Sequence, residues 1–309
     1  MHAVVVEQPG SADALRWREL PDPSLASGQV LVAIEAAGVN PVDIGNRTEV
    51  TWAGLTPPYV VGYEFAGTVL TADGTQLRSG DPVWGLLPVR GTRWGAYAER
   101  IVVDASYVSL RPAGLDSVQA AVLPLAGGTA LQVLDRLALP SGAWLLVHGA
   151  AGGVGHLLVQ IAVQRGLRVA AASRVDDRER MLQLGVELWI DRAAPDAVPA
   201  ATAELGRPFD GVADLVGGLL ITSLPALAEG AQAATIVDLQ GDYDAAIDRN
   251  VSIHGVLLRP GQDLLSQLAT AVGAGLTPRL SATYPLARAA DAHRQLALGG
   301  VGGKIALTT

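Results

Sequence analysis

The sequence predicts an α/β protein in which a barrel-like β domain is joined to a second domain built on a parallel β-sheet. Three observations lead to this fold class. The chain has 309 residues, which is enough for about two domains. Short β-like runs separated by glycine and proline fill its first part, whereas strands alternate with helices from residue 144 onward. Hydrophobic residues make up 50% of the chain, so both domains can bury a core.

Turn-forming residues divide the first part into short segments, and strands at this spacing are typical of a compact antiparallel barrel. The predicted strands cover residues 3–6, 29–36, 67–70, 82–85 and 96–103. Asp116 or Ser117 can then cap a helix through residues 119–123. A second helix, 129–137, ends near Pro140.

The remainder of the chain alternates between strand and helix, which implies βαβ units and a parallel sheet. The predicted strands are 144–148, 168–172, 188–190, 211–215, 234–239 and 253–257. The helices between them include 154–165 and 177–184. Two helices, 263–275 and 286–298, and a final strand, 304–308, complete the chain.

The glycine-rich turn between strand 144–148 and helix 154–165 matches a dinucleotide-binding fingerprint. Ala150, Gly152 and Gly155 occupy its three small positions. The first permits a tight turn, the second lets the backbone approach a pyrophosphate, and the third allows close helix–strand packing. The helix N-terminus then offers N–H groups to phosphates. A flexible loop is the alternative, but the flanking strands and helix favour a dinucleotide site.

The end of the next strand indicates which dinucleotide binds. A carboxylate there would bind the adenosine ribose of NAD, but the sequence has Ser173 and Arg174. A hydroxyl and a guanidinium suit the 2′-phosphate of NADPH. Asp176 and Asp177 follow and would repel that phosphate. The alternative is that Arg174 and Arg178 are surface cations paired with these aspartates.

Composition excludes several other functions. The formal net charge is −8 and no basic cluster occurs, which argues against nucleic acid or an anionic membrane surface as a partner. The chain has no cysteine, which excludes disulfides, thiolate metal sites and cysteine nucleophiles. No stretch approaches about 18 apolar residues and the N-terminus lacks signal-peptide features, so we expect a cytoplasmic protein that acts on a small molecule.

Seven segments together resemble the medium-chain dehydrogenase/reductase superfamily, in its zinc-free quinone oxidoreductase and enoyl reductase branch. They are AGVNPVD at 37–43, VGYEFAG at 61–67, GAYAE at 95–99, LPLAGGTA at 123–130, GAAGGVG at 149–155, DLVGG at 214–218 and GKIAL at 303–307. The resemblance implies a GroES-like catalytic domain, 1–116 and 261–309, and a Rossmann domain with a doubly wound parallel sheet, 117–260. It also implies that the cofactor, NADPH, binds between the two domains.

Zinc-dependent relatives carry a cysteine where Asn40 stands and a histidine where Tyr63 stands. The resemblance therefore implies that no catalytic zinc binds, and the five histidines show no close ligand spacing. Without a Lewis acid, hydride addition to an already conjugated enone or quinone is easier than alcohol oxidation.

The resemblance also implies roles for individual residues. Asn40, Tyr63 and Thr129 are the predicted catalytic residues, with Asn40 near the nicotinamide ribose or the substrate carbonyl. The predicted cofactor-binding residues are Asn40, Thr129, Ala151, Gly152, Gly153, Val154, Ser173, Arg174, Arg178, Val216, Gly217, Leu239, Gly241 and Leu257. Structural alternatives are a turn at Asn40, a helix cap at Thr129, and pairing roles for Asp43 and Glu64.

Two positions depart from the family pattern. Gly45 stands where many relatives have a tyrosine, and Asp177 stands where NADP-binding relatives often have a lysine. The proton donor stays open among Tyr59, Tyr63 and solvent.

The leading hypothesis is NADPH-dependent reduction of a conjugated carbonyl or quinone. The alternatives are a non-redox cyclase, isomerase or lyase on the same scaffold, and a nucleotide-binding protein without catalysis. We also expect a homodimer in which an apolar edge strand, 234–239 or 253–257, pairs with its own copy. Coverage of that edge by helix 263–275 would instead leave a monomer.

Overall fold

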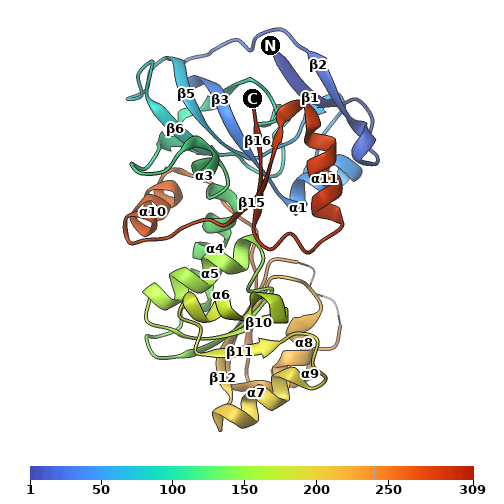
Figure 1. Cartoon of the computed structure of the whole chain (residues 1–309), viewed down its shortest axis with the longest axis vertical. Coiled ribbons are helices and arrows are strands. Elements are labelled where there is room, and N and C mark those ends of the chain that lie inside the picture. Colours follow the sequence, from blue (N-terminus) through green and yellow to red (C-terminus); the bar gives the residue numbers. More distant parts are fainter. Residues whose placement is uncertain (238, 240) are drawn as a thin grey trace. The chain divides into compact units, whose positions relative to one another are not determined.

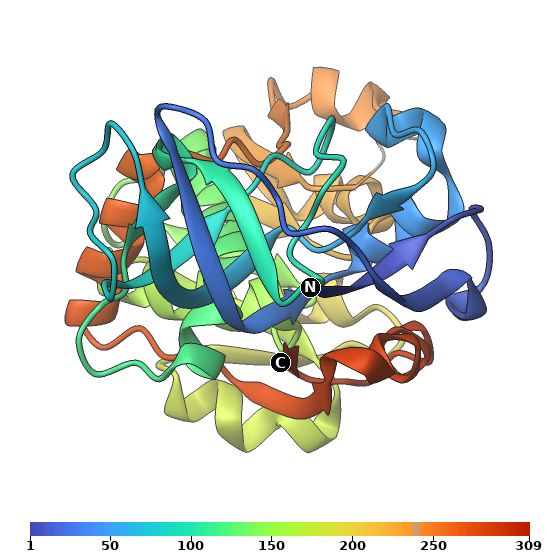
Figure 2. The ribbon, with the colours of Figure 1, turned by 90° about the horizontal axis from the view of Figure 1, so that it is seen from above.

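The computed structural model describes residues 1–237, 239 and 241–309. The chain divides into two compact units, which are Met1–Gly128 with Leu258–Thr309, and Thr129–Leu257. The first division falls after Gly128 instead of the expected residue 116. The reason is that helix α3 (Ser117–Ala121) contacts β3 (Gln29–Val39) and β5 (Glu64–Ala72) of the first unit. Both chain ends lie in that unit (Figures 1 and 2).

The first unit is built on two sheets. The larger has the strand order β15-β16-β3-β5-β6-β8, with β7 also paired to β3. The smaller has the order β2-β1-β4. The further strands are β1 (His2–Val6), β2 (Leu15–Glu19), β4 (Tyr59–Val60), β6 (Pro82–Leu86), β7 (Arg100–Asp104), β8 (Val108–Leu110), β15 (Leu280–Pro285) and β16 (Lys304–Thr308). β16 pairs antiparallel with β3, so the final strand returns to the first unit as predicted (Figure 1).

The burial pattern of β3 suits a strand that lies inside this sheet. Inward residues alternate with half-buried ones along most of its length. The backbone of β5 comes so close at Gly67 that a Cβ there would lie 2.0 Å from the Ala33 carbonyl oxygen. The predicted strand 96–103 is wrong over its first half. Residues 96–99 form only an isolated bridge, between Ala98 and Ala3, and β7 begins at Arg100.

Helices α1 (Pro41–Thr48), α2 (Val50–Ala53), α10 (Gln262–Gly273) and α11 (Ala289–Ala297) complete the first unit. α10 and α11 were predicted, with slightly wider bounds. α1 was not, because an Asn-Pro step is also a turn signal. Here Pro41 occupies the first helical position, where its missing N–H costs nothing.

The second unit is a six-stranded parallel sheet with the order β11-β10-β9-β12-β13-β14. Its strands are β9 (Trp144–His148), β10 (Arg168–Ser173), β11 (Leu188–Asp191), β12 (Phe209–Asp214), β13 (Leu227–Thr235) and β14 (Ser252–Gly255). Its helices are α5 (Gly153–Gln164), α6 (Arg178–Gln183), α7 (Ala197–Leu205), α8 (Leu219–Ser223) and α9 (Asp244–Ile247), and α4 (Pro124–Leu137) begins in the first unit. The order is that of a Rossmann fold and confirms the predicted fold class.

The strand predicted at 234–239 is misplaced and overlaps β13 only at residues 234 and 235. β13 begins at Leu227 and ends at Thr235, and residue 238 lies outside the described residues. Alanine, glycine and glutamate at 228–231 have low strand propensity, so the sequence pattern conceals the start of β13. Small side chains such as Ala233 and Ala234 are nevertheless fully buried in the sheet.

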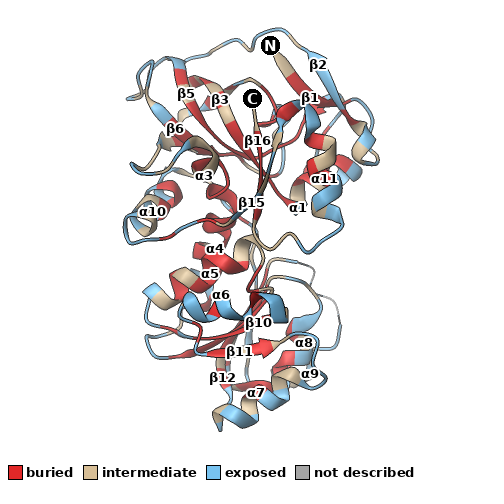
Figure 3. Cartoon of the chain, in the orientation of Figure 1, coloured by how far each residue is buried: buried red, intermediate tan, exposed pale blue. Residues whose placement is uncertain are grey.

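The core of the second unit lies between the sheet and its helices. Phe209, Leu146, Val212 and Leu224 are fully buried there, whereas α7 keeps an exposed face (Figure 3). Within the described part of the chain, no helix has both the length and the apolar character needed to cross a membrane.

Candidate functional site

The glycine-rich turn joins β9 to α5 and leaves an open helix N-terminus. Gly152 is the N-cap of α5, and no side chain caps it. Its N–H donates to the Gly149 oxygen at 3.0 Å, while its own oxygen accepts from the His156 N–H at 2.9 Å. The first N–H groups of a helix have no intrahelical acceptor. Gly153 and Val154 are partly exposed here, so this end of α5 can bind an anion.

Gly149, Gly152 and Gly155 of the turn have different structural roles. A Cβ on Gly155 would lie 2.1 Å from the Gly149 oxygen, so Gly155 is required for packing. A Cβ on Gly152 would approach only that oxygen, at 3.2 Å. Gly149 has a φ of +74°, so the tight turn falls one residue before Ala150, which was expected to make it. Of these three glycines, Gly152 has the most room for a side chain, because only the Gly149 oxygen would have to yield, by a few tenths of an ångström.

The turn lies at the switch point of the sheet, where β9 and β12 are neighbours although other strands separate them in the sequence. Asp214, at the end of β12, accepts four backbone N–H bonds of 2.8–3.0 Å. These bonds fix the loop that carries Val216 and Gly217. A Cβ added at Gly149 would lie 2.8 Å from Val216 Cγ2, so the loop reaches the glycine-rich turn.

His148, at the end of β9, is a structural residue of the same region. Its Nε2 lies 2.7 Å from Ser223 Oγ, and that hydroxyl donates to the Leu219 oxygen at 2.7 Å. Since the hydroxyl has a single proton, His148 is the donor of the first bond. Burial lowers the pKa of His148, which keeps the ring neutral.

At the end of β10, Ser173 and the arginines form a cationic corner around one buried carboxylate. Asp177 accepts from Arg174 Nε at 3.2 Å and from Arg180 at 2.7 Å. Ser173 Oγ accepts from Trp189 Nε1 at 2.9 Å, and the Arg178 guanidinium lies 5.2 Å from the Trp189 ring centre. Two arginines thus compensate the negative charge of Asp177, which was expected to repel a 2′-phosphate. The sequence suggested, as the alternative, pairing of Arg174 and Arg178 with the aspartates. That pairing is present between Arg174 and Asp177.

The other predicted cofactor residues lie on the loops that follow the strands or near the start of the unit. Leu239 and Val216 are about half exposed, Leu257 is partly exposed, and Gly241 has a φ of +121°. Thr129 and Ala151 are buried. Val237, which the sequence did not single out, lies beside Gly217, because a Cβ there would be 3.2 Å from Val237 Cγ1.

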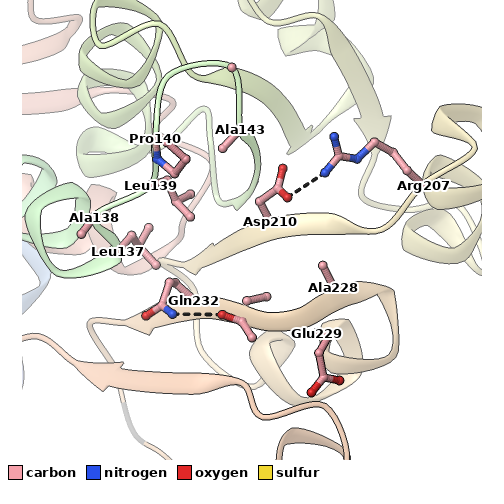
Figure 4. Close-up of a pocket in the computed structure, with 13 residues that line it drawn as sticks. Leu137, Ala138, Leu139, Pro140, Ala143, Arg207, Asp210, Ala228, Glu229 and Gln232 are labelled. Carbon is pink, nitrogen blue, oxygen red and sulfur yellow. Dashed lines mark hydrogen bonds and ion pairs between the residues drawn. The ribbon is translucent and has the colours of Figure 1, made fainter.

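A groove of about 660 Å³ lies at the opposite end of this sheet (Figure 4). Arg207 and Asp210 pair there at 2.7 Å, and Asp210 also accepts from the Trp144 N–H at 2.7 Å. Its polar groups therefore satisfy one another. Ligands of open parallel sheets bind at the carboxyl ends of the strands, so this groove is not the candidate site.

In the first unit, Asn40 belongs to a buried polar cluster. Its Nδ2 donates to Glu64 Oε1 at 2.8 Å, and its Oδ1 accepts from Lys304. Lys304 also donates to Glu64 Oε1 at 2.7 Å, and the Leu125 N–H donates to Glu64 Oε2 at 2.8 Å. Both polar groups of the Asn40 side chain are thus engaged. The sequence had suggested a pairing role for Glu64, and the pairing is present.

Asp43 receives a chain of donors from three parts of the first unit. Its Oδ2 accepts from the Asn40 N–H at 2.7 Å and from the Tyr97 hydroxyl at 3.1 Å. Tyr97 lies 3.1 Å from His293 Nε2, and Arg47 lies 3.1 Å from His293 Nδ1. Burial, with the charge of Arg47, lowers the pKa of His293 to about 3. The ring is therefore neutral, donates from Nε2 and accepts at Nδ1.

Burial raises the pKa of Asp43 to about 7, against the Asn40 N–H and the charge of Lys304, which both lower it. Its Oδ1 is buried without a partner in the described part of the chain. Tyr97 and Glu64 are the other titratable groups that act on it.

Tyr63 contacts α1 through Asn46 and is fully buried. Its hydroxyl accepts from Asn46 Nδ2 at 2.6 Å, and the same nitrogen donates to the Val89 oxygen at 2.8 Å. Burial raises the pKa of Tyr63 well above that of a free tyrosine. Gly45 has open space where its side chain would be, so the missing tyrosine leaves room there.

Among the described residues, no group of three or more histidine, cysteine, aspartate or glutamate side chains is placed to hold a metal ion. The sequence did not single out Asn46, Tyr97 or His293 as members of the site. Lys304 could have been found, because it is the only lysine of the chain.

Comparison with known proteins places this geometry in a family. Residues 26–113 match the alcohol dehydrogenase GroES-like domain, and residues 184–307 match the zinc-binding dehydrogenase domain. Quinone oxidoreductase of Sus scrofa is 30% identical over 96% of this chain and 94% of its own. The solved structure of quinone oxidoreductase from Coxiella burnetii has a TM-score of 0.91, 28% identity, and coverage of 100% of this chain and 99% of its own.

Two plant proteins are also similar. NADPH-dependent alkenal/one oxidoreductase of Arabidopsis thaliana is 29% identical over 99% of this chain and 78% of its own. 2-methylene-furan-3-one reductase of Solanum lycopersicum is 36% identical over 67% of this chain. The match spans only 55% of that longer protein.

We predict that Lys304→Met strongly destabilises the protein. The substitution leaves the fully buried Glu64 carboxylate without its cation, which typically costs about 3–5 kcal/mol. Chemical denaturation measures the loss, and Lys304→Met combined with Glu64→Gln is the control that should recover most of it. A single variant as stable as the wild type would contradict the role given to this pair.

We predict that Asp43→Asn gains stability relative to the wild type as the pH rises. With a raised folded pKa, Asp43 contributes stability below its unfolded pKa, and this is lost as the pH rises from about 4 through about 7. A tenfold change in proton affinity corresponds to about 1.4 kcal/mol. The variant should therefore gain about 1 kcal/mol or more between roughly pH 4 and pH 8 in urea denaturation. The exposed Asp263→Asn is the control, and equal slopes for wild type and Asp43→Asn would refute this assignment.

Proposed function

Because the chain belongs to the medium-chain dehydrogenase/reductase superfamily, in its quinone oxidoreductase branch, we propose that this oxidoreductase reduces a conjugated carbonyl. The substrate would be an enone, an enoyl compound or a quinone, the cofactor NADPH, and no zinc would be needed. The uncapped, glycine-lined N-terminus of α5 at the switch point of the sheet is the observation that carries the proposal. The names of the relatives, among them an alkenal/one oxidoreductase and a quinone oxidoreductase, support the substrate class.

The residues of the second unit fit this cofactor. Gly152, Gly153 and Val154 would hold the pyrophosphate with the N–H groups of the first turn of α5. Ser173, Arg174 and Arg178 would surround the 2′-phosphate, and Val216 and Gly217 would lie beside the nicotinamide half. Thr129, Ala151, Leu239, Gly241 and Leu257 complete the proposed cofactor set.

When bound, NADPH supplies a hydride that adds to the β-carbon of the substrate, while the electron pair of the double bond moves to the carbonyl oxygen. A proton then adds to the α-carbon, so one NADPH and one proton are consumed for each double bond reduced. The hydroxyl of Tyr59 donates to the Asn46 oxygen at 2.8 Å, and burial raises its pKa to about 12. The hydroxyls of Tyr59 and Tyr63 are both hydrogen-bonded to Asn46, so the proton would come from solvent.

The burial of Asn40 and Tyr63 favours positioning over direct contact with substrate. Both amide groups of Asn40 are used by Glu64 and Lys304, and Tyr63 fixes Asn46. An amide and a phenol with these partners are also poor ligands for zinc, which prefers thiolate, imidazole and carboxylate. Thr129 is then the predicted catalytic residue that would contact the nicotinamide.

The proposal is tested by NADPH consumption with a panel of enones and quinones, with and without a chelator. We expect loss of NADPH absorbance with at least one compound and the same rate after chelation. Product formation without nucleotide oxidation would show a non-redox enzyme. NADPH binding without turnover of any compound would favour a protein without catalysis, and inactivation by the chelator would overturn zinc independence.

We predict that Gly152→Val blocks NADPH binding while the protein stays folded. A side chain there meets only the Gly149 oxygen, yet it occupies the space where a pyrophosphate would approach. Calorimetric titration with NADPH and a thermal melt measure the two properties. Gly155→Ala is the contrasting variant and should unfold, because its Cβ has no room. Undiminished affinity in folded Gly152→Val would contradict the site.

We predict that the wild type prefers NADPH to NADH and that Arg174→Ala loses about tenfold or more of this preference. Charge-assisted hydrogen bonds contribute roughly 1.5–3 kcal/mol each. The dissociation constants of both cofactors are compared in wild type and variant. Arg207→Ala, an exposed arginine far along the sheet, is the control. Equal affinities in the wild type would defeat the prediction.

We further propose that the protein is a homodimer. Of the two expected edge strands, β13 lies inside the sheet and only β14 lies at its edge. An unpaired edge is a liability that pairing with a second copy removes. Light scattering should give a dimer mass for the wild type and a monomer mass for Ile253→Asp, and a monomeric wild type would refute the homodimer.

A cytoplasmic location stays a prediction from the sequence.

A further inference from the structure

Two pairs of an arginine and an exposed tryptophan lie on the surface of the first unit, and their arginines are three residues apart in the sequence. Trp52, on α2, is 41% exposed, and Trp94 is 47% exposed. Arg90 and Arg93 are exposed and three residues apart in the segment that follows β6. We call these four residues the arginine–tryptophan patch. Aromatic residues and arginine are enriched on surfaces that bind partners.

Each arginine of the patch is held in place by two contacts. The Arg90 guanidinium lies 4.6 Å from the Trp52 ring centre, and its Nε donates to the Trp52 oxygen at 2.7 Å. The Arg93 guanidinium lies 4.9 Å from the Trp94 ring centre, and its Nε donates to the Pro58 oxygen at 3.0 Å. Stacking and a backbone acceptor therefore orient both cations before any ligand arrives.

Neither cation is neutralised by a neighbour. Across the described ranges, no carboxylate forms an ion pair with Arg90 or Arg93, whereas Arg168, which also stacks on a tryptophan, pairs with Glu187 at 2.7 Å. The chain as a whole carries a net charge of −8. Two oriented and unneutralised guanidiniums on an acidic protein form a local site for an anion.

The same segment of chain connects the patch to the buried polar residues around α1. The Leu87 N–H donates to the Tyr63 oxygen at 2.7 Å, and the Val89 oxygen accepts from Asn46 at 2.8 Å. One residue later the chain reaches the surface at Arg90, and the Gly91 N–H donates to the Ala53 oxygen at 2.8 Å. A molecule that lies beside α1 near Gly45 would thus have the patch within reach of its remote end.

From this arrangement we infer that the arginine–tryptophan patch binds the anionic end of the substrate. The enzyme would then prefer conjugated carbonyls that carry a carboxylate or a phosphate some distance from the reacting double bond. The guanidiniums would bind the anion through their N–H groups, and the indoles would cover the apolar chain next to it. The net negative charge disfavours a large polyanion such as nucleic acid or an anionic membrane. The inference rests on the proposed reductase function.

The test compares linear enones with a terminal carboxylate or a terminal phosphate with the neutral methyl ester of the same length. For the wild type we expect a higher kcat/KM for the acids than for the ester. The variant Arg90→Gln with Arg93→Gln should lower the acid-to-ester ratio about tenfold or more, with little change for the ester. The arginine-to-glutamine change at Arg16, an exposed residue beside the exposed Trp17, is the matched control and should leave the ratio unchanged. The larger loss among the two acids identifies the preferred anion.

The outcomes separate this inference from the proposed function. If the ester is reduced and the acid-to-ester ratio does not respond to the double variant, the function stands and the inference is wrong. If no compound is reduced, calorimetric titration of acid and ester still decides, because equal dissociation constants in the wild type overturn the inference. Binding of an oligonucleotide or of anionic vesicles that is lost in the double variant would assign the patch to a macromolecule and also overturn it.

Discussion

The buried carboxylate of Glu64 is the interaction on which the first unit depends. It is inaccessible to solvent and accepts bonds from Asn40 at the start of α1, Lys304 at the start of β16, and the Leu125 N–H at the start of α4. A buried charge is tolerated only when it is paired and its remaining lone pairs are satisfied. Three segments far apart in the sequence must therefore meet at one side chain for the unit to fold.

The burial of Glu64 also explains why residue 38 is a glycine and why the C-terminal strand returns to the first unit. A Cβ on Gly38 would lie 2.1 Å from Glu64 Oε1 and 2.7 Å from the Ala121 oxygen, so the strand before α1 can pass the carboxylate only as glycine. Because Lys304 is the cation, the C-terminal strand has to return to the first unit and pair with β3. Packing, charge pairing and topology thus specify the same arrangement, which is the consistency expected of a foldable sequence.

The parts of the fold that were predictable are those with local signals. The glycine-rich turn, the strand before it and α5 after it follow from residues within one βαβ unit, so their positions are confirmed almost to the residue. β13 was misplaced because its buried positions are alanines, whose burial is set by neighbouring strands. The Glu64–Lys304 pair spans 240 residues, and no local pattern connects its members. Local motifs indicated Gly152, Ser173 and Arg174, whereas the remaining cofactor residues were assigned only through the family resemblance, because their positions are spread along several loops.

Amide and phenol groups surround α1 at two positions, Asn40 and Tyr63, where the family resemblance implies metal ligands in zinc-dependent relatives. A cysteine and a histidine at the positions of Asn40 and Tyr63 would need a metal ion to compensate their charge and lone pairs. Here Glu64 and Lys304 engage both polar groups of the Asn40 side chain, and Asn46 donates to the Tyr63 hydroxyl. A catalytic zinc site offers an open coordination position. Here the polar groups of Asn40 are engaged by Glu64 and Lys304, and the open space beside α1 lies at Gly45. Under the proposed zinc-free reduction, chemistry at this site would rely on orientation and on a substrate that is already activated by conjugation.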